Sequence, residues 1–275
     1  MSNCRYLITN GVISQTANVP PVASFLEAHP GAYTTSRTHS TASCVLFWDR
    51  HLRRLVESAR ILAETKPEYL FGMEKAGISS YSVAPSSWDS IVWPMVNHSL
   101  RNVLPVALEG RNEGEELAIT ALVSGNVPSM EENRKKERTI HALDVYLHIG
   151  VYVPPVFGTK ESSAHLAVVG PGRDIANAKF SEWVRVCLAM GISVSEVAPS
   201  WSERELWEEA FITNSLRLVQ HVETIRVPSP WEDFQHKTWK DVAWNEKQFK
   251  EGAGRITAAI QREVMKRSSL EGYPV

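Results

Sequence analysis

A strand followed at once by a long helix, within residues 31–62, constrains the fold of this chain more than any other segment. Its first part is rich in β-branched and aromatic residues, and their alternation places Tyr33, Thr35 and Arg37 on one face of a strand. The helix is expected to begin at Asp49, a suitable N-cap residue. Its buried face carries apolar residues at helical spacing, namely Leu52, Leu55, Val56, Ala59 and Leu62. The segment therefore predicts a strand packed beside an amphipathic helix.

Arg54 lies away from that apolar face. It shares its row with Ser58 and Ile61, so this second face of the helix is also partly apolar. An arginine in such surroundings requires an anionic partner. Spacing alone leaves two readings open, because a basic helix also carries ordinary surface arginines.

The run from His51 through Arg54 and Leu55 to Leu62 resembles the HLxRLxxSAxxL segment of the class IV (fold type IV) aminotransferases. That family includes branched-chain and D-amino acid aminotransferases and aminodeoxychorismate lyases, which use pyridoxal 5'-phosphate. The resemblance implies a two-domain α+β fold of the D-amino acid aminotransferase type. It also implies that Arg54 holds the cofactor phosphate.

The same resemblance gives the strand before the helix a role in binding substrate. Tyr33, Thr35 and Arg37 would face the substrate. Arg37 would bind a carboxylate, because a guanidinium group binds a carboxylate through two parallel hydrogen bonds.

Lys179 is the expected catalytic residue. Flanking Ala178 and Phe180 favour partial desolvation, which lowers a lysine pKa and leaves a neutral amine to attack an aldehyde. Local sequence alone also fits a surface lysine on a helix. The pattern PGRxxxNxKxxxW around it resembles the cofactor-lysine segment of plant members of the family. The resemblance implies that Lys179 binds the cofactor covalently and moves the substrate α-proton.

A late segment of the chain, residues 209–225, resembles the family motif EAFxTNSxRxVxPVxxI. The resemblance implies that Thr213, Asn214 and Ser215 bind the cofactor phosphate through hydroxyls and backbone amides. The simpler reading is a turn between two strands.

An expected EGxxxN motif, whose glutamate pairs with the pyridine nitrogen in this family, is not found. The sequence passes near Arg185 directly into what resembles a later helix and strand, so we expect an incomplete second domain. A splice variant or a gene-model error would explain the gap. Glu209 and Asn214 have the spacing of the missing motif, but the residues after Asn214 favour the phosphate-turn assignment.

Composition indicates a globular protein of 275 residues with 43% hydrophobic residues. With 29 basic and 31 acidic residues, the chain has no charge excess for nucleic acid or an anionic membrane. Three distant cysteines argue against a disulfide framework or a zinc site. The N-terminus passes at once into a predicted hairpin at Asn10-Gly11, so we expect no leader peptide and a cytoplasmic protein.

Two long alternating runs, at residues 117–123 and 143–153, predict a substantial sheet in the first half. Between the earlier helix and these strands, a region around residues 88–104 rich in Trp and Pro reads as helical. A Pro-Pro pair and a polar stretch then suggest a linker at 156–164, separating domains at 1–155 and 165–275.

Together these features predict a pyridoxal-phosphate-dependent transaminase of the branched-chain or D-amino acid type, acting on an amino acid and a 2-oxo acid. The family resemblance implies a homodimer, and no metal is expected. One alternative is an aminodeoxychorismate-type lyase, which shares the fold, lysine and phosphate site. Another is a truncated, non-catalytic isoform that binds a complete version of the protein.

Overall fold

The chain divides into two compact units, Met1–Val153 with Glu271–Val275 and Pro154–Leu270. The computed structural model describes residues 5–14, 19–71, 88–126, 143–168, 190–191, 199–229 and 241–275. The expected linker at 156–164 belongs to the second unit. It is held there because the Gln220 side-chain amide donates to the carbonyl oxygens of Ser162 and Ser163 at 2.9 and 3.2 Å.

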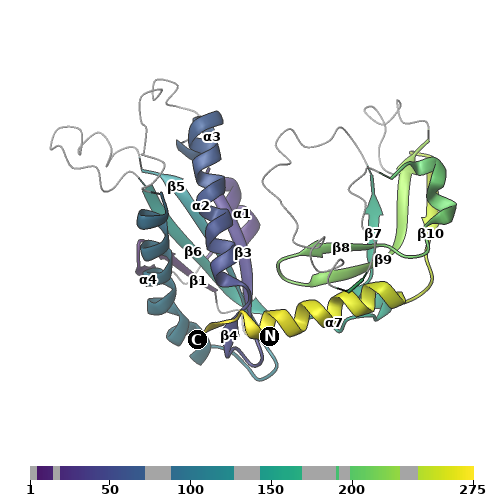
Figure 1. Cartoon of the computed structure of the whole chain (residues 1–275). Helices are drawn as coiled ribbons and strands as arrows, with labels where there is room; N and C mark the ends of the chain where they lie inside the picture. The colour runs from purple at the N-terminus through teal and green to yellow at the C-terminus, as the bar shows by residue number, and fades with distance from the viewer. Residues whose placement is uncertain are drawn as a thin grey trace. The chain divides into compact units, whose positions relative to one another are not determined.

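The first unit is built on an antiparallel sheet with helices on it (Figure 1). The strand order is β11-β4-β3-β5-β6-β1-β2. Its elements are β1 (Arg5–Thr9), β2 (Val12–Ser14), α1 (Val22–Ala28), β3 (Ala32–His39), β4 (Cys44–Val45), α2 (Trp48–Thr65), α3 (Pro67–Phe71), α4 (Trp88–Glu109), β5 (Glu116–Gly125), β6 (Leu143–Tyr152) and β11 (Tyr273–Pro274). The predicted strand and helix of residues 31–62 are therefore confirmed as β3 and α2.

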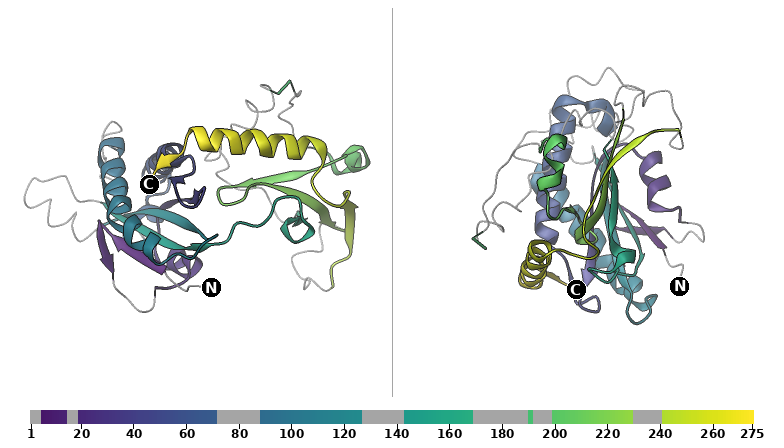
Figure 2. Two further views of the ribbon diagram at one scale, coloured as in Figure 1. Left: turned by 90° about the horizontal axis from the view of Figure 1, so that it is seen from below. Right: turned by 90° about the vertical axis from the view of Figure 1, so that its right-hand side faces the viewer.

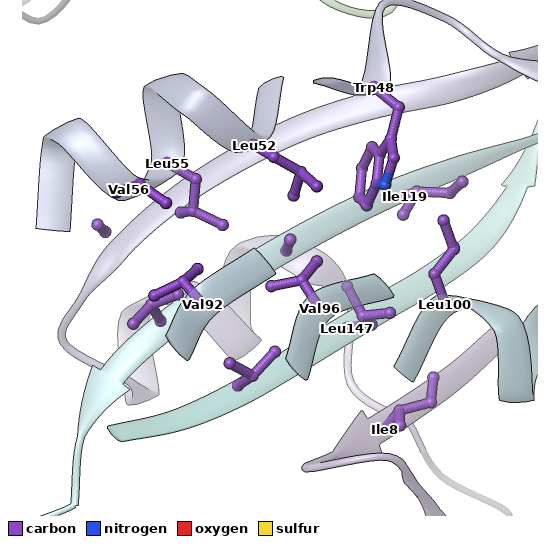
Figure 3. Close-up of a cluster of buried hydrophobic side chains, with 14 of the residues drawn as sticks. Ile8, Trp48, Leu52, Leu55, Val56, Val92, Val96, Leu100, Ile119 and Leu147 are labelled. Atoms are coloured by element: carbon purple, nitrogen blue, oxygen red, sulfur yellow. The ribbon is translucent and has the colours of Figure 1, made fainter. Parts of the chain in front are cut away.

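Helices α2 and α4 cover one face of this sheet, and the core lies between them and the strands (Figure 3). Alternation within β5 and β6 supplies the sheet side of the core, with Ile119 paired to Ile149 and Ala121 to Leu147. Trp48 is fully buried at the start of α2, and its indole N–H donates to the Asn97 side chain of α4 at 2.8 Å. Apolar residues of α2 fill the remaining space, namely Leu52, Leu55, Val56 and Ala59.

The start of α2 differs from the prediction that Asp49 is its N-cap. Phe47 is the N-cap, in the left-handed region at φ 46°. Its carbonyl accepts the first helical hydrogen bond, from the His51 amide at 3.0 Å. Asp49 lies inside the first turn, where a carboxylate is favoured by the helix dipole.

Helix α1 lies on the other face of the sheet (Figure 2, right-hand view). The ring of Phe25 in α1 lies 5.9 Å from the rings of both Tyr146 and His148 of β6. His148 Nε2 lies 2.8 Å from the Pro20 carbonyl, and burial lowers the pKa of His148. This neutral histidine helps hold the chain before α1 on the sheet.

The connection between β3 and β4 is a left-handed turn made without glycine. Ser40, Thr41 and Ala42 have φ angles of 54°, 58° and 63°, which costs about 1–2 kcal/mol for each residue. The carboxylate of Glu116 in β5 accepts the amides of Thr41 and Ala42, both at 3.1 Å, and the Thr38 hydroxyl at 2.5 Å. Glu116 therefore stabilises the turn that follows β3.

The second unit contains a smaller sheet with strand order β10-β9-β7, to which β8 adds by pairing with β9. Its elements are η3 (Lys160–Ser162), β7 (Ala164–Ala167), η5 (Trp201–Leu206), β8 (Phe211–Asn214), β9 (Leu218–Pro228), β10 (Trp244–Gln248) and α7 (Arg255–Leu270). Strand β7 is parallel to β9, whereas β8 and β10 are antiparallel to it. Helix α7 packs on β9 (Figure 1). In the described part of the chain, no helix is long and apolar enough to cross a membrane.

Removal of the Glu116 carboxylate is expected to destabilise the first unit. Glu116→Ala leaves two backbone amides and the buried Thr38 hydroxyl without an acceptor, which should lower the free energy of unfolding by about 3 kcal/mol. Urea unfolding of this variant and of Glu113→Ala, which changes an exposed glutamate shortly before the same strand, measures the effect. Equal midpoints for the two variants would show that the turn does not depend on Glu116.

Candidate functional site

A polar contact between β3 and α2 lies beside the apolar core of the first unit. The Thr34 hydroxyl of β3 lies 2.9 Å from Nδ1 of His51 in α2. His51 is only 8% exposed. Burial, with a smaller contribution from the nearby charge of Arg54, lowers the pKa of His51 to about 4. His51 is therefore neutral near pH 7, and its ring fixes this part of α2 to β3.

Arg54 lies three residues after His51 on α2, at an exposed position. Within the described residues it forms no hydrogen bond or ion pair. Arg60 of this helix differs, because it binds Glu57 and Glu64 at 2.6 and 2.9 Å. The exposed Arg53 is like Arg54 in forming no such contact within the described residues. The Arg54 guanidinium is consequently available for an external anion.

The opposite face of β3 carries the residues predicted to face the substrate. Tyr33 is 56% exposed. Thr35 is half-buried, and its hydroxyl lies 3.1 Å from the Thr120 hydroxyl of β5. The strand register continues this row to His148 in β6. The row is polar, in contrast to the apolar row that meets α2.

Arg37 lies on the same face near the C-terminal end of β3 and is only 5% exposed. Its Nη1 donates to the Thr38 carbonyl at 3.0 Å, and its guanidinium lies over the Tyr152 ring, 5.9 Å from the centroid. Burial lowers the pKa of Arg37, against the opposing effects of Tyr152 and Glu116. The charge of Arg37 is thus held among groups of the protein itself. The structure groups Tyr33, Thr35 and Arg37 on one face and places Thr34 and His51 on the other.

The predicted phosphate segment forms the hairpin between β8 and β9 in the second unit (Figure 1). Asn214 shapes this turn, because its side-chain oxygen accepts the amides of Leu216 and Arg217 at 3.1 and 2.7 Å. The hydroxyls of Thr213 and Ser215 form no hydrogen bond within the described part of the chain. Two hydroxyls without a partner among the described residues therefore lie in a turn that the Asn214 side chain holds in shape.

Glu209, two residues before β8, was not predicted to have a structural role. Its carboxylate accepts the amides of Ile256 and Thr257, both at 2.9 Å, and the Thr257 hydroxyl at 2.6 Å, at the start of α7. Burial tends to raise the pKa of Glu209, but these hydrogen bonds outweigh it and the pKa is lowered. Because Glu209 and Asn214 both bind backbone groups of the protein, the structure disfavours the alternative in which they form the EGxxxN motif.

Two sequence-predicted features lie outside the described residues. Lys179, the expected catalytic residue, and Arg185, the position near which a segment is expected to be missing, belong to residues 169–189. Across the described ranges, no group of three or more His, Cys, Asp or Glu side chains could hold a metal ion. Roles for His51 and Glu209 were missed because each depends on a partner distant in sequence. The only local signal was the place of His51 in the run that contains Arg54.

Comparison of the sequence with protein-family models and with curated proteins gives no match. Solved structures do match in fold. The branched-chain aminotransferase from Thermoproteus uzoniensis with norvaline has a TM-score of 0.51 at 12% identity, covering 97% of this chain and 95% of that chain. The branched-chain amino acid aminotransferase of Escherichia coli has a TM-score of 0.52 at 12% identity, with 97% of this chain and 95% of that chain covered.

A third similar structure is the branched-chain amino acid aminotransferase from Thermobaculum terrenum in its PLP-form, with a TM-score of 0.52 at 12% identity and coverage of 98% and 96%. These likenesses confirm the predicted α+β fold of the branched-chain and D-amino acid aminotransferase type. The expected missing segment and the affinity to plant members stay predictions.

The buried His51 is expected to make stability depend on pH. In the unfolded chain the imidazole binds a proton near its ordinary pKa of 6.5, whereas in the folded protein it does so only at about 4. As the pH falls from 6.5 to about 4, the unfolded chain gains a proton that the folded protein does not, so the free energy of unfolding should decrease by about 3 kcal/mol. Above pH 6.5 His51 is neutral in both states and causes no such decrease.

Urea unfolding of the wild type and of His51→Gln, followed from pH 7 to pH 4, measures that contribution. The variant should show a shallower pH dependence, because it lacks the group that gains a proton on unfolding. His98→Gln, at an exposed position on α4, is the matched control and should keep the wild-type slope. A wild-type slope in His51→Gln would contradict the assignment of a neutral, buried His51.

Proposed function

We propose that the chain is a pyridoxal-phosphate-dependent, fold type IV aminotransferase-like enzyme that moves an amino group between an amino acid and a 2-oxo acid. The observation that carries the proposal is Arg54, an exposed guanidinium without a partner in the described part of the chain, at the family's phosphate-binding position. The fold of the similar structures supports it, as do the norvaline and PLP that two of them hold. The substrate would be of the branched-chain or D-amino acid type.

Each proposed donor has the chemistry to bind the phosphate of this cofactor. Phosphate oxygens accept strong hydrogen bonds from guanidinium, hydroxyl and backbone N–H groups. Arg54, Thr213 and Ser215 offer donors that no described group occupies. Asn214 contributes by holding the turn, since its side-chain oxygen binds two backbone amides. When bound, the cofactor supplies an electron sink for the bond that breaks at the substrate α-carbon.

Two sets of residues have distinct roles in the proposed mechanism. Lys179 holds the cofactor covalently, takes the proton from the substrate α-carbon and returns it, as general base and acid. Tyr33 and Thr35 orient the substrate on the polar face of β3, with Arg37 as the carboxylate-binding group. Because Arg37 is 5% exposed, this last role requires its guanidinium to leave Thr38 and Tyr152 when substrate binds.

His51 supports Arg54 in this proposal by staying uncharged. A protonated imidazole one turn away would repel the guanidinium and compete for the same anion. With a pKa of about 4, His51 adds no positive charge beside Arg54 near pH 7.

Loss of the Lys179 amine should abolish covalent binding of the cofactor. Wild-type protein mixed with pyridoxal phosphate should develop a new absorption band, and borohydride should fix the cofactor on the Lys179 peptide, found by mass analysis. Lys179→Ala should give neither signal, whereas Lys160→Ala, which changes an exposed lysine of η3, should give both. A folded wild-type protein without band or label would refute the enzymatic proposal and favour the non-catalytic isoform.

Neutralising Arg54 should weaken cofactor binding without unfolding the protein. Loss of one charged phosphate contact is expected to raise the dissociation constant of pyridoxal phosphate about tenfold to a hundredfold in Arg54→Gln. Arg53→Gln is the matched control, because Arg53 is the exposed neighbour on the same helix. Fluorescence titration measures both. Equal affinities in the two variants would remove Arg54 from the phosphate site.

A further inference from the structure

Strand β8 is short. It comprises only Phe211–Asn214 and pairs with β9 alone among the described strands. Its pairing begins with the hydrogen bond from the Val222 amide to the Ala210 carbonyl at 2.9 Å. A short strand with one neighbour frays easily, because few hydrogen bonds hold its ends. The turn at Thr213–Ser215 would move with it.

The chain immediately before β8 is fixed by a different interaction. The Glu209 carboxylate binds three donors at the start of α7, two of them backbone amides. Thr257, which supplies two of the three donors, is fully buried, so these groups have no water to replace Glu209. Helix α7 packs on β9, the strand that pairs with β8. The start of β8 is therefore held by Glu209, which binds α7, and by β9, which contacts both α7 and β8.

Gly254 makes the approach of Glu209 to α7 possible. A Cβ added at Gly254 would collide with the carboxylate of Glu209, and the nearest atoms it would meet all belong to that side chain. Only glycine leaves space for the carboxylate to reach the first amides of the helix. The contact therefore needs both the carboxylate of Glu209 and the lack of a side chain at Gly254.

We infer that Glu209 is a positioning residue, which fixes the start of β8 on α7 and so sets the place of the Thr213–Ser215 turn. The inference rests on the proposed function for the meaning of that turn as a phosphate site. Glu209 itself does not touch the cofactor, because its oxygens are taken up by α7. It acts through β8, whose last two residues, Thr213 and Asn214, belong to that turn.

Glu209→Gln tests this with little change in shape. The amide retains one acceptor oxygen, but its NH₂ group would face a backbone N–H donor of α7, so the contact between residue 209 and α7 should weaken. We expect faster hydrogen exchange at residues 211–214 and a roughly tenfold higher dissociation constant for pyridoxal phosphate. Gly254→Ala should produce the same two changes, and the double variant should add little, because both act on one contact.

Two controls separate positioning from general destabilisation. Glu208→Gln changes the exposed neighbour and should behave as wild type. Thr257→Val removes one donor from α7 but leaves both backbone amides for Glu209, so its unfolding midpoint should fall while its cofactor affinity stays within about twofold of wild type.

The outcomes distinguish this inference from the proposed function. Wild-type affinity and exchange in Glu209→Gln, in a protein whose binding still depends on Arg54, would overturn the inference and leave the function standing. Should the wild type bind no pyridoxal phosphate, the function fails, and hydrogen exchange alone decides. Faster exchange at β8 in Glu209→Gln but not in Glu208→Gln then supports the positioning role, and unchanged exchange overturns it.

Discussion

The register of β3 determines which side chains reach the helix layer and which reach the opposite face of the sheet. Side chains alternate along a strand, so a shift by one residue would exchange the two sets. The observed register pairs Thr34 with Ala121 and Thr35 with Thr120. Thr34 therefore meets His51 in α2, and Tyr33, Thr35 and Arg37 form the polar face. Both parts of the candidate site in this unit depend on this one alignment.

Periodicity along the chain was sufficient to predict the strands and helices, but not the capping and long-range hydrogen bonds that hold them in place. Strands β3 and β5 and helix α2 follow from patterns of two and 3.6 residues, which are local properties. The true N-cap of α2 was not foreseen, because no local signal places Phe47 in the left-handed region. Glu116 and Glu209 bind partners 74–78 and 47–48 residues away, and such contacts are decided only when the chain folds.

The candidate site residues fall into two kinds in each unit taken by itself. The groups available to a ligand, Arg54, Thr213 and Ser215, have no partner in the described structure. Their neighbours, in contrast, are satisfied by backbone or side-chain contacts, as with His51, Asn214 and Glu209. Unpaired donors tolerate exposure because water solvates them until a ligand arrives. Of the supporting groups, only His51 is buried and must be paired, whereas Glu209 is half-buried and Asn214 is exposed. Resemblance to a family indicated the available groups and also Asn214, but the contacts that hold His51, Asn214 and Glu209 are seen only in the folded structure.

The predicted gap near Arg185 separates cofactor binding from turnover in physical terms. In the proposed function, phosphate binding would draw on Arg54 and on the β8–β9 turn, and neither belongs to the expected missing segment. The electron sink draws on a carboxylate that keeps the pyridine nitrogen protonated. Glu209 has the sequence spacing for that part but not the freedom, because three donors of α7 occupy its oxygens. A chain that has the phosphate donors but lacks that carboxylate should bind the cofactor more readily than it turns over substrate. Cofactor binding with little turnover would distinguish such an impaired enzyme from a complete transaminase and from a protein that binds no cofactor.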